Sequence, residues 1–534
     1  MSLSPFRRRG PALFVAAAGL TWALLSPVHA QTLRWAAAGD PLTLDPYAQN
    51  ELLTNSINGQ VYEFLVARDK QLEIVPQLAT EWKQDGPMKW VFKLRPNVKF
   101  HDGRPFTADD VVFSVERAKQ PTSQIAVYAN ALGTVRKIDD LTVEFTTPQF
   151  EPIFLQKLNT VYMMSKGWAE QNNATVTQNF AAKEEHYAAR NANGTGPFML
   201  VSRAPGVKTV YKRNPNYWGR IEGNVQDVVF TPIGSGATRT AALISGELDF
   251  MLDPPPTDVE RLRRTPGVKI IDGPENRIIF IGMDQGRDEL LYSSVKGKNP
   301  LKDLRVRKAL YHAIDIETIK TKLMNGQAVP SGALVTSPLG TLGDPDVQRR
   351  LPYDVELAKK LMAEAGYPDG FEITFDTPND RYINDERIAI TLASQWARIG
   401  VKVRVNAQTK SLFFNKVEKL DTSMYLFGWG GSITDPETTF TPIYRNRGAK
   451  GVGEYNRGNY KDDELDALAA ASSKEQDPAK RRQLIRQTFL RHNEQVRHIP
   501  LHWQMIPWAA RPGVEVVHRA DNWLEWRWVT VGKP

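Results

Sequence analysis

The chain has 534 residues, a formal net charge of +8 and no cysteine. A 41% share of hydrophobic residues can fill large cores, and at roughly 150 residues per domain the length predicts two or three domains. The lack of cysteine excludes a disulfide framework, a thiol nucleophile and a thiolate metal site. Basic residues are interspersed with acidic ones, so we expect no nucleic-acid binding.

The first thirty residues have the pattern of a cleavable signal peptide. Arg7 to Arg9 precede an apolar stretch, Leu13 to Leu25, and Val28 to Ala30 form a cleavage site before Gln31. The stretch is shorter than the ~20 residues of a membrane span, which disfavours the alternative of an uncleaved anchor. No cysteine follows the cleavage point, so we expect a periplasmic protein that is not a lipoprotein.

The mature chain mixes strands and helices from its beginning. Residues 90–94 alternate as a strand, and Thr107 is placed to cap a helix. Residues 371–375 and 401–405 also alternate as strands, and the helix between them ends at Gly400. This βαβ unit predicts parallel pairing with a right-handed crossover, so the fold class is α/β.

Several short stretches follow one another in an order and spacing that are together highly specific, although each alone is weak. They are Leu44 to Pro46, Pro76 to Trp82, Val98 to Gly103, Thr107 to Val111, Gly194 to Phe198, Arg213 to Trp218, Gly246 to Asp249 and Arg305 to Leu310. Through them nearly the whole mature chain resembles the family 5 extracellular solute-binding proteins. These are the dipeptide, oligopeptide, nickel-chelate and glutathione binders of ABC importers.

The resemblance implies a two-lobed periplasmic-binding-protein fold of type II, similar to cluster C, with an extra small subdomain in the first lobe. We expect lobe 1 to be discontinuous and lobe 2 to follow it. The expected segments are 31–60, 195–280 and 506–534 for lobe 1, 61–194 for the subdomain and 281–505 for lobe 2. Solute that contacts both lobes only when they close would shift the protein toward the form that a permease accepts.

The resemblance also implies ligand-binding residues. In peptide-binding relatives an aspartate in a Trp-x-x-Asp stretch pairs with the peptide amino group, but here Ser432 follows Trp429 at that spacing. A hydroxyl cannot neutralise an ammonium in a dry cleft, so strict recognition of a free peptide N-terminus is in doubt. Asp435 could substitute, at a position that is usually structural. Trp429 matches a pocket aromatic, with a core tryptophan as the alternative.

A second group of candidates follows the strand at residues 371–375. Arg381, next to Tyr382, resembles the arginine that receives the ligand carboxylate in dipeptide binders, and its planar guanidinium suits that task. The alternative for Arg381 is a surface ion pair. An arginine here combined with Ser432 favours an anionic or neutral-polar solute over a cationic one.

Three more candidates come from the first lobe. Asn50 and Asn55 match positions that face the cleft in metal-chelate-binding relatives, with turn or capping roles as the alternative. Arg277 stands at the start of an apolar strand, Ile278 to Ile281, where it is either near the lobe junction or a surface charge at a strand end.

We therefore expect the solute-binding component of an ABC importer for a peptide-sized solute such as a di- or oligopeptide, a modified peptide or an opine. A metal chelate or a glutathione-like anion is the alternative within the same fold. A periplasmic chaperone and a secreted hydrolase are alternatives from other classes, although neither an H-E-x-x-H nor a G-x-S-x-G motif is present. We expect no catalytic residue, cofactor or metal, a monomer, and a permease with its ATPase as partners.

Overall fold

The computed structural model describes residues 1–2 and 31–532, apart from 181, 256, 380, 432, 449 and 450. Residues 3–30 of the predicted signal peptide and the candidate Ser432 therefore lie outside the described residues. Within the described part of the chain, no helix has both the length and the apolar character needed to cross a bilayer.

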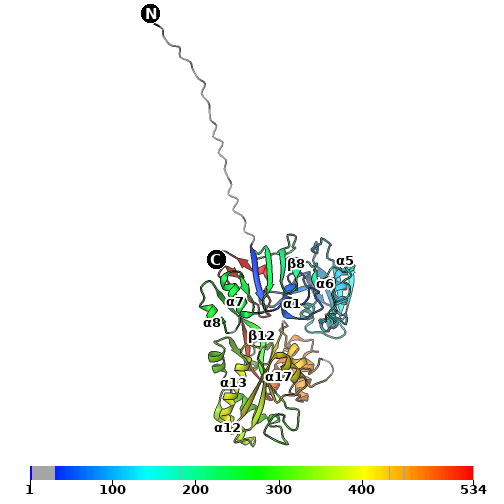
Figure 1. Ribbon diagram of the computed structural model, residues 1–534. Helices are drawn as coiled ribbons and strands as arrows, with labels where there is room; N and C mark the ends of the chain where they lie inside the picture. The colour runs from blue at the N-terminus through cyan, green and yellow to red at the C-terminus, as the bar shows by residue number, and fades with distance from the viewer. Residues whose placement is uncertain are drawn as a thin grey trace.

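The described residues form two halves that are joined by long strands (Figure 1). The upper half carries β1 to β11 and α1 to α8, and the lower half carries β13 to β16 and α9 to α17. Strands β12 (Lys269–Met283) and β17 (His498–Ala510) pair antiparallel and take part in both halves. Together with their neighbours they form one eleven-stranded sheet of the described chain. One hydrogen-bonded sheet therefore runs through both halves.

The upper half is built around parallel pairing of β1 with β10 and β11. Its main elements are β1 (Thr32–Ala37), α1 (Leu52–Asn58), β8 (Phe198–Ala204), β9 (Lys208–Arg213), β10 (Asp227–Pro232), α7 (Gly236–Ser245), β11 (Phe250–Met251) and α8 (Val259–Arg263). Two short strands near the C-terminus, β18 (Val514–Glu515) and β19 (Thr530–Val531), pair with each other.

Residues 61–194 add a separate sheet to the upper half. Its strands run in the order β4-β5-β7-β6, and Thr107 begins α2 with a capping box to Asp110, as the sequence predicts. The elements of this region are β2 (Val66–Arg68), β3 (Ile74–Pro76), β4 (Ala79–Gln84), β5 (Lys89–Leu94), α2 (Ala108–Ala118), α3 (Ala126–Ala131), β6 (Thr134–Asp139), β7 (Thr142–Thr146), α4 (Phe154–Leu158), α5 (Lys166–Gln171) and α6 (Tyr187–Arg190).

The lower half contains the predicted βαβ unit, because β14 pairs parallel with β15 and α13 connects them. Its elements are α9 (Leu304–His312), α10 (Ile316–Thr318), β13 (Ala328–Pro330), α11 (Pro345–Gln348), α12 (Val355–Glu364), β14 (Glu372–Pro378), α13 (Asp385–Trp396), β15 (Lys402–Gln408), α14 (Lys410–Glu418), β16 (Met424–Gly430), α15 (Glu437–Thr439), α16 (Asp463–Ser472) and α17 (Pro478–Glu494).

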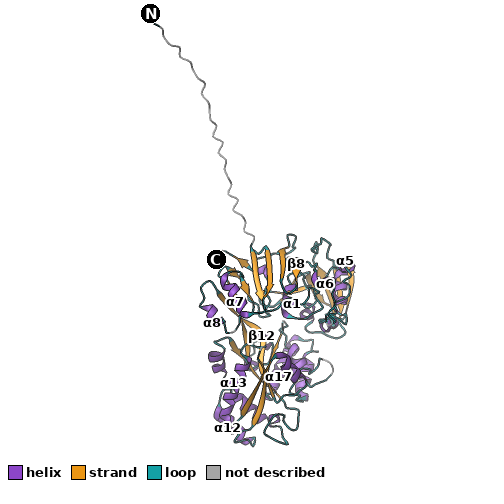
Figure 2. Cartoon of the chain, viewed as in Figure 1, coloured by secondary structure: helices purple, strands orange, loops and turns teal. Residues whose placement is uncertain are grey.

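Two hydrophobic cores lie on opposite faces of the lower sheet. Along β12, Ile279 and Ile281 enter the core that includes α13, whereas Ile278 and Phe280 enter the core that includes α17. This follows from the alternation of side chains along a strand. Figure 2 shows the corresponding helices on both sides of the central strands. A strand buried on both faces reads as a continuous apolar run, which is why residues 278–281 show no polar alternation.

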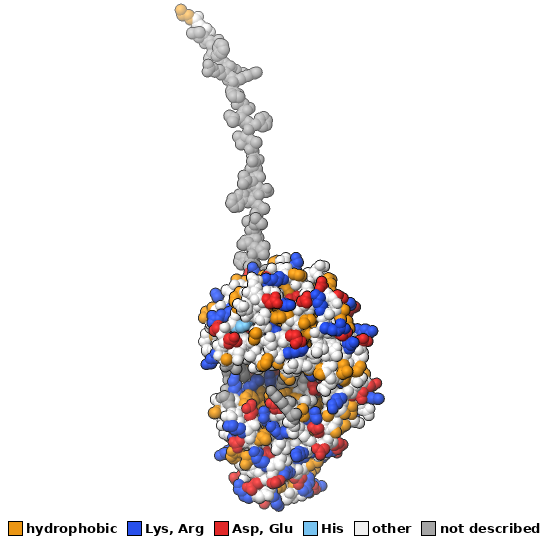
Figure 3. Space-filling model, turned by 90° about the vertical axis from the view of Figure 1, so that its right-hand side faces the viewer, with side chains coloured by type: hydrophobic (Ala, Val, Ile, Leu, Met, Phe, Trp, Pro, Cys, Tyr) orange, Lys and Arg blue, Asp and Glu red, His pale blue; other side chains and the backbone are white. Residues whose placement is uncertain are grey.

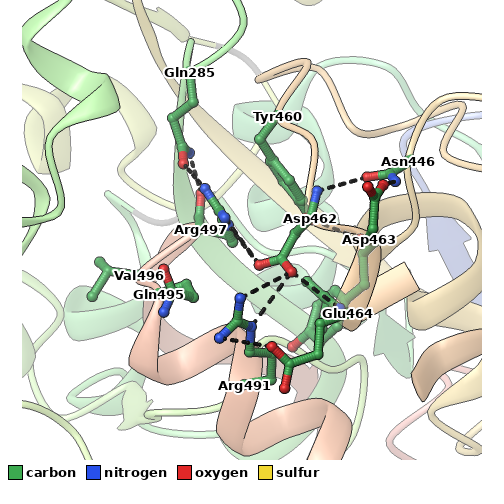
Figure 4. A network of polar contacts seen from close by, with 12 residues as sticks. Gln285, Asn446, Tyr460, Asp462, Asp463, Glu464, Arg491, Gln495, Val496 and Arg497 are labelled. Carbon is green, nitrogen blue, oxygen red and sulfur yellow. Dashed lines mark hydrogen bonds and ion pairs between the residues drawn. The ribbon is translucent and has the colours of Figure 1, made fainter. Parts of the chain in front are cut away.

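A charged network fixes the end of α16 in the lower half (Figure 4). Asp462 accepts hydrogen bonds from Leu465 N at 3.1 Å and Arg497 Nη2 at 2.9 Å, and Arg491 Nη2 lies 3.3 Å away. Burial opposes ionisation of Asp462, but these donors outweigh it and lower its pKa. The carboxylate therefore remains charged and serves as a helix cap and a tie between neighbouring segments.

Candidate ligand-binding cleft

A cleft of about 1000 Å³ lies where β12 and β17 pass between the halves. Figure 3 shows a hollow across the middle of the molecule, with Lys or Arg side chains inside it. Both halves supply lining side chains. The polar ones include Asn50, Glu51, Asp253 and Asn522 from the upper half and Asn379, Arg381, Asp385, Glu386, Arg387 and Lys410 from the lower half. This volume suits a solute of several residues or a similar organic molecule.

The floor of the cleft is formed where the β12–β17 ladder is interrupted. Pairing stops at Pro274 and resumes at Ile278. Glu275 and Arg277 lie in this gap, and both line the cleft. The ladder break therefore turns two charged side chains of a central strand toward the solute space.

Arg277 is held by its neighbour two residues away. Its Nε donates to Glu275 Oε1 at 3.0 Å, and the two side chains are only 15% and 10% exposed. The guanidinium lies over Gly430, where a Cβ atom would come within 2.9 Å of Arg277 Cζ. Burial opposes the charge, but Glu275 outweighs this and raises the pKa of Arg277. The group is thus a fixed cation. The sequence predicted it at the start of a strand, whereas it lies inside β12, because Gly273 and Pro274 mask the strand pattern without preventing extended backbone.

The lower wall is the loop between β14 and α13. Arg381 N and Tyr382 N each donate to Asp385 Oδ2 at 3.0 Å, which closes the loop at the start of α13. The Tyr382 hydroxyl donates to Gly428 O at 3.3 Å, so the buried ring anchors the loop on β16. The Arg381 guanidinium lies 5.3 Å from the centre of the Tyr382 ring. Arg381 is exposed at the cleft, together with Arg387 and Lys410.

The upper wall presents two carboxylates, Glu51 and Asp253. Both oxygens of Glu51 accept hydrogen bonds from backbone N–H groups of α1, at Leu53 and Thr54. Burial raises the pKa of Asp253, and the negative charges of Glu275 and Glu51 raise it further. The upper wall therefore presents carboxylates, whereas the lower wall combines guanidinium and ammonium groups with the carboxylates of Asp385 and Glu386.

The structure brings some of the predicted ligand residues together in this cleft and separates others from it. Asn50, Arg277, Arg381 and Tyr382 line it. Asn55 does not, but its Nδ2 donates to Asn50 Oδ1 at 3.0 Å and so supports a lining residue.

Trp429 is not among the residues that line the cleft. Its Nε1 donates to Thr438 O at 3.2 Å, and its ring packs 4.8 Å from that of Tyr455, at the edge of a core. Asp435 is bound by Arg481 through both oxygens, at 2.8 and 2.9 Å. This pairing gives Asp435 the structural role that its position suggested.

Most of the cleft residues escaped the sequence prediction, and Glu275, Gln504 and Asp253 show why. Glu275 and Gln504 are polar residues inside strands whose other positions are mostly apolar, and that interruption was the available signal. Asp253 follows the two-residue strand β11 and offered no comparable signal. A polar residue inside a strand indicates a site only once the pairing of that strand, and the point where the pairing is interrupted, are known.

Comparison with known proteins agrees with this geometry. Residues 73–451 match the family model described as bacterial extracellular solute-binding proteins, family 5 Middle. The chain is 28% identical over 439 residues to heme-binding protein A of Haemophilus influenzae, covering 78% of this chain and 76% of that protein. It is 28% identical over 462 residues to the dipeptide-binding protein of Escherichia coli, covering 81% and 82%.

Solved structures show the same fold. The ABC transporter substrate-binding protein CtaP of Listeria monocytogenes superposes with a TM-score of 0.81 at 23% identity, covering 94% of this chain and 99% of that one. A dipeptide-binding protein of a Pseudoalteromonas species, solved with Met-Leu, gives a TM-score of 0.73 at 23% identity, covering 94% and 100%. The predicted family and the predicted two-lobed α/β fold are thus confirmed.

Proposed function

This chain belongs to the family 5 extracellular solute-binding proteins, and we propose that it captures a peptide-sized solute with an anionic group in the cleft between its lobes and delivers it to an ABC permease. The observation that carries the proposal is the 1000 Å³ cleft, in whose lower wall Arg381, Arg387 and Lys410 outnumber the carboxylates of Asp385 and Glu386. Relatives named for dipeptide and glutathione binding support a solute of this size.

Closure of the lobes is the proposed mechanism. The cleft residues come from both halves, so a solute gains all of its contacts only when the halves approach each other. We place the lobes at 31–60, 195–280 and 506–534, with the subdomain 61–194, and at 281–505. In support of this division, one core contains residues between 33 and 252 and between 506 and 529, whereas two others contain only residues between 278 and 503.

The remaining parts of the proposal follow from the family and the sequence. A protein that delivers solute to a permease acts without catalysis, so we propose no enzymatic activity. Export would follow cleavage after Ala30, and the product would be a monomer in the periplasm without a lipid anchor. Its partners would be the permease and the associated ATPase.

A ligand panel tests the function. Co-purified solute is removed by mild unfolding and refolding, and thermal unfolding is recorded with di- to tetrapeptides, glutathione, opines, sugar phosphates and metal chelates. A solute at 100 times its dissociation constant should stabilise the protein by about 2.7 kcal/mol. Selective stabilisation by an anionic class supports the proposal. Saturable binding of denatured proteins, with no response to any compound, would favour a chaperone instead.

Two alanine variants, one at Arg381 and one at Arg404, test the site with the compounds of the panel. Arg381→Ala should weaken binding of the stabilising compound by about 1–3 kcal/mol through loss of a charge-assisted contact. Arg404→Ala, which removes an exposed arginine of β15 outside the cleft, should leave binding unchanged. Equal affinity in both variants would remove Arg381 from the site.

A further inference from the structure

We propose that Glu275 and Gln504 are positioning residues that hold Arg277 as the binding group for a carboxylate or phosphate of the solute at the cleft floor. This inference rests on the proposed function, because it assigns the anionic group of the solute to a particular place. The floor differs from the Arg381 loop in that it belongs to the two strands shared by both halves.

The first argument is that the two Nη atoms of the Arg277 guanidinium have no acceptor among the described residues. Its Nε is occupied by Glu275, whereas neither Nη1 nor Nη2 has a hydrogen-bond acceptor among the described residues. Arg277 lines the cleft, so this pair of amino groups is available to the solute. A planar pair of N–H donors fits a carboxylate or phosphate in a bidentate manner, as a lysine ammonium does not.

The second argument is the chain of contacts behind Arg277. Gln504 Nε2 donates to Glu275 Oε2 at 2.6 Å, and Gln504 Oε1 accepts from Ile383 N at 3.1 Å. Gln504 and Glu275 are both buried. Burying a side-chain amide is costly unless both of its ends are hydrogen-bonded, and here both are. The relay fixes the fork of Arg277 and also ties it to the loop that carries Arg381.

The third argument is the charge of the opposite wall. Glu51 and Asp253 line the upper wall, and Asp253 lies close enough to Glu275 and Glu51 for their negative charges to raise its pKa. The Glu51 carboxylate therefore disfavours an anionic group at the upper wall and favours its placement toward Arg277 and the lower wall. Gly430 completes the arrangement, because any larger residue there would press on the guanidinium.

Selenate is a suitable probe, because its anomalous scattering locates it and its binding does not depend on the identity of the solute. In crystals of ligand-free protein soaked with selenate, we expect a selenium anomalous peak roughly 4 Å from both Nη atoms of Arg277, with two selenate oxygens at about 2.7–3.1 Å from those atoms. The peak should be absent in Arg277→Gln and weak in Arg277→Lys. A peak only at Arg381 or at surface residues would be an adventitious ion only and would overturn the proposal.

The positioning role is measured by selenate affinity in solution. Gln504→Met keeps the volume but removes both hydrogen bonds, and equilibrium dialysis should show about three- to tenfold weaker binding. Gln395→Met is the matched control, because the Gln395 amide is also hydrogen-bonded at both ends, to the N–H and C=O of Asp315, but lies outside the cleft. It should lose stability without losing selenate affinity.

Equal affinity in the wild type and Gln504→Met, or an equal loss in both glutamine variants, would contradict the positioning role. The outcome is separable from that of the ligand panel. A protein that binds selenate at Arg277 but responds to no compound of the panel would count against the proposed function and not against the anion site.

Discussion

Two arginine–carboxylate pairs in this protein use the same chemistry for different purposes. In the upper half, Arg117 and Asp45 are both fully buried, at 0% exposure, and every nitrogen of the Arg117 guanidinium has a partner, including the carbonyls of Ala174 and Val176. At the cleft floor, Arg277 gives only Nε to Glu275. A closed pair holds the fold together, whereas a half-open pair leaves donors for a solute.

The largest expected effect comes from opening the closed pair. Asp45→Asn leaves the Arg117 charge buried without a counter-charge and should lower the free energy of unfolding by about 3–5 kcal/mol, measured by urea denaturation. Glu116→Gln, which removes the exposed partner of Lys119, should change it by less than about 0.5 kcal/mol. A small effect of Asp45→Asn would mean that the closed pair is not structural.

The next largest effect is expected from His502, a buried imidazole whose burial favours the neutral form. Burial lowers the pKa of His502 to about 3, and neither ring nitrogen has a partner among the described residues. Burial of the neutral imidazole costs no stability above the unfolded pKa, near 6.5. Stability is lost as the pH falls from there toward 3, because only the unfolded state gains the proton. His502→Leu should thus remove about 2 kcal/mol of the stability loss that the wild type shows between pH 7 and pH 5. Parallel pH profiles would refute this.

Disturbing the packing of Tyr382 against Gly428 should have an intermediate effect on the free energy of unfolding. A Cβ atom at residue 428 would lie 2.5 Å from Tyr382 Cε1, so Gly428→Ala should cost about 1–3 kcal/mol of unfolding free energy and displace the Arg381 loop. Gly431→Ala is the control, since nothing lies within 4 Å of a Cβ atom there. Equal thermal midpoints for the two variants would show that the Tyr382 anchor is dispensable.

The half-open pair should have the smallest effect on stability. Arg277→Gln removes the counter-charge of Glu275, but Glu275 keeps its hydrogen bond from Gln504 and both side chains are partly exposed at the cleft. We therefore expect a loss of about 1–2 kcal/mol in urea denaturation, less than for Asp45→Asn. A loss as large as that of Asp45→Asn would place Arg277 with the structural pairs and weaken the distinction between the two kinds of pair.

Much of the fold was predictable because it depends on local pattern. Thr107 caps α2, Gly400 ends the helical stretch that follows α13, and β14 pairs with β15 in parallel, each from hydrophobic period and capping chemistry that act over a few residues. The candidate site was predictable only in part. Arg381 and Tyr382 follow a recognisable strand end, whereas Asp253 became a cleft residue through contacts with segments remote in sequence.

The sequence by itself determined the α/β class, some helix ends such as those at Thr107 and Gly400, and the family, because caps, periodicity and motif order are properties of neighbouring residues. Only the tertiary structure decided which guanidinium groups are fully hydrogen-bonded within the protein and which keep donors for a solute. Asp45 meets Arg117 across 72 positions, and Gln504 meets Glu275 across 229. Whether a guanidinium keeps free donors depends on what the folded chain brings beside it, and no local pattern encodes the break in the β12–β17 ladder that exposes Arg277.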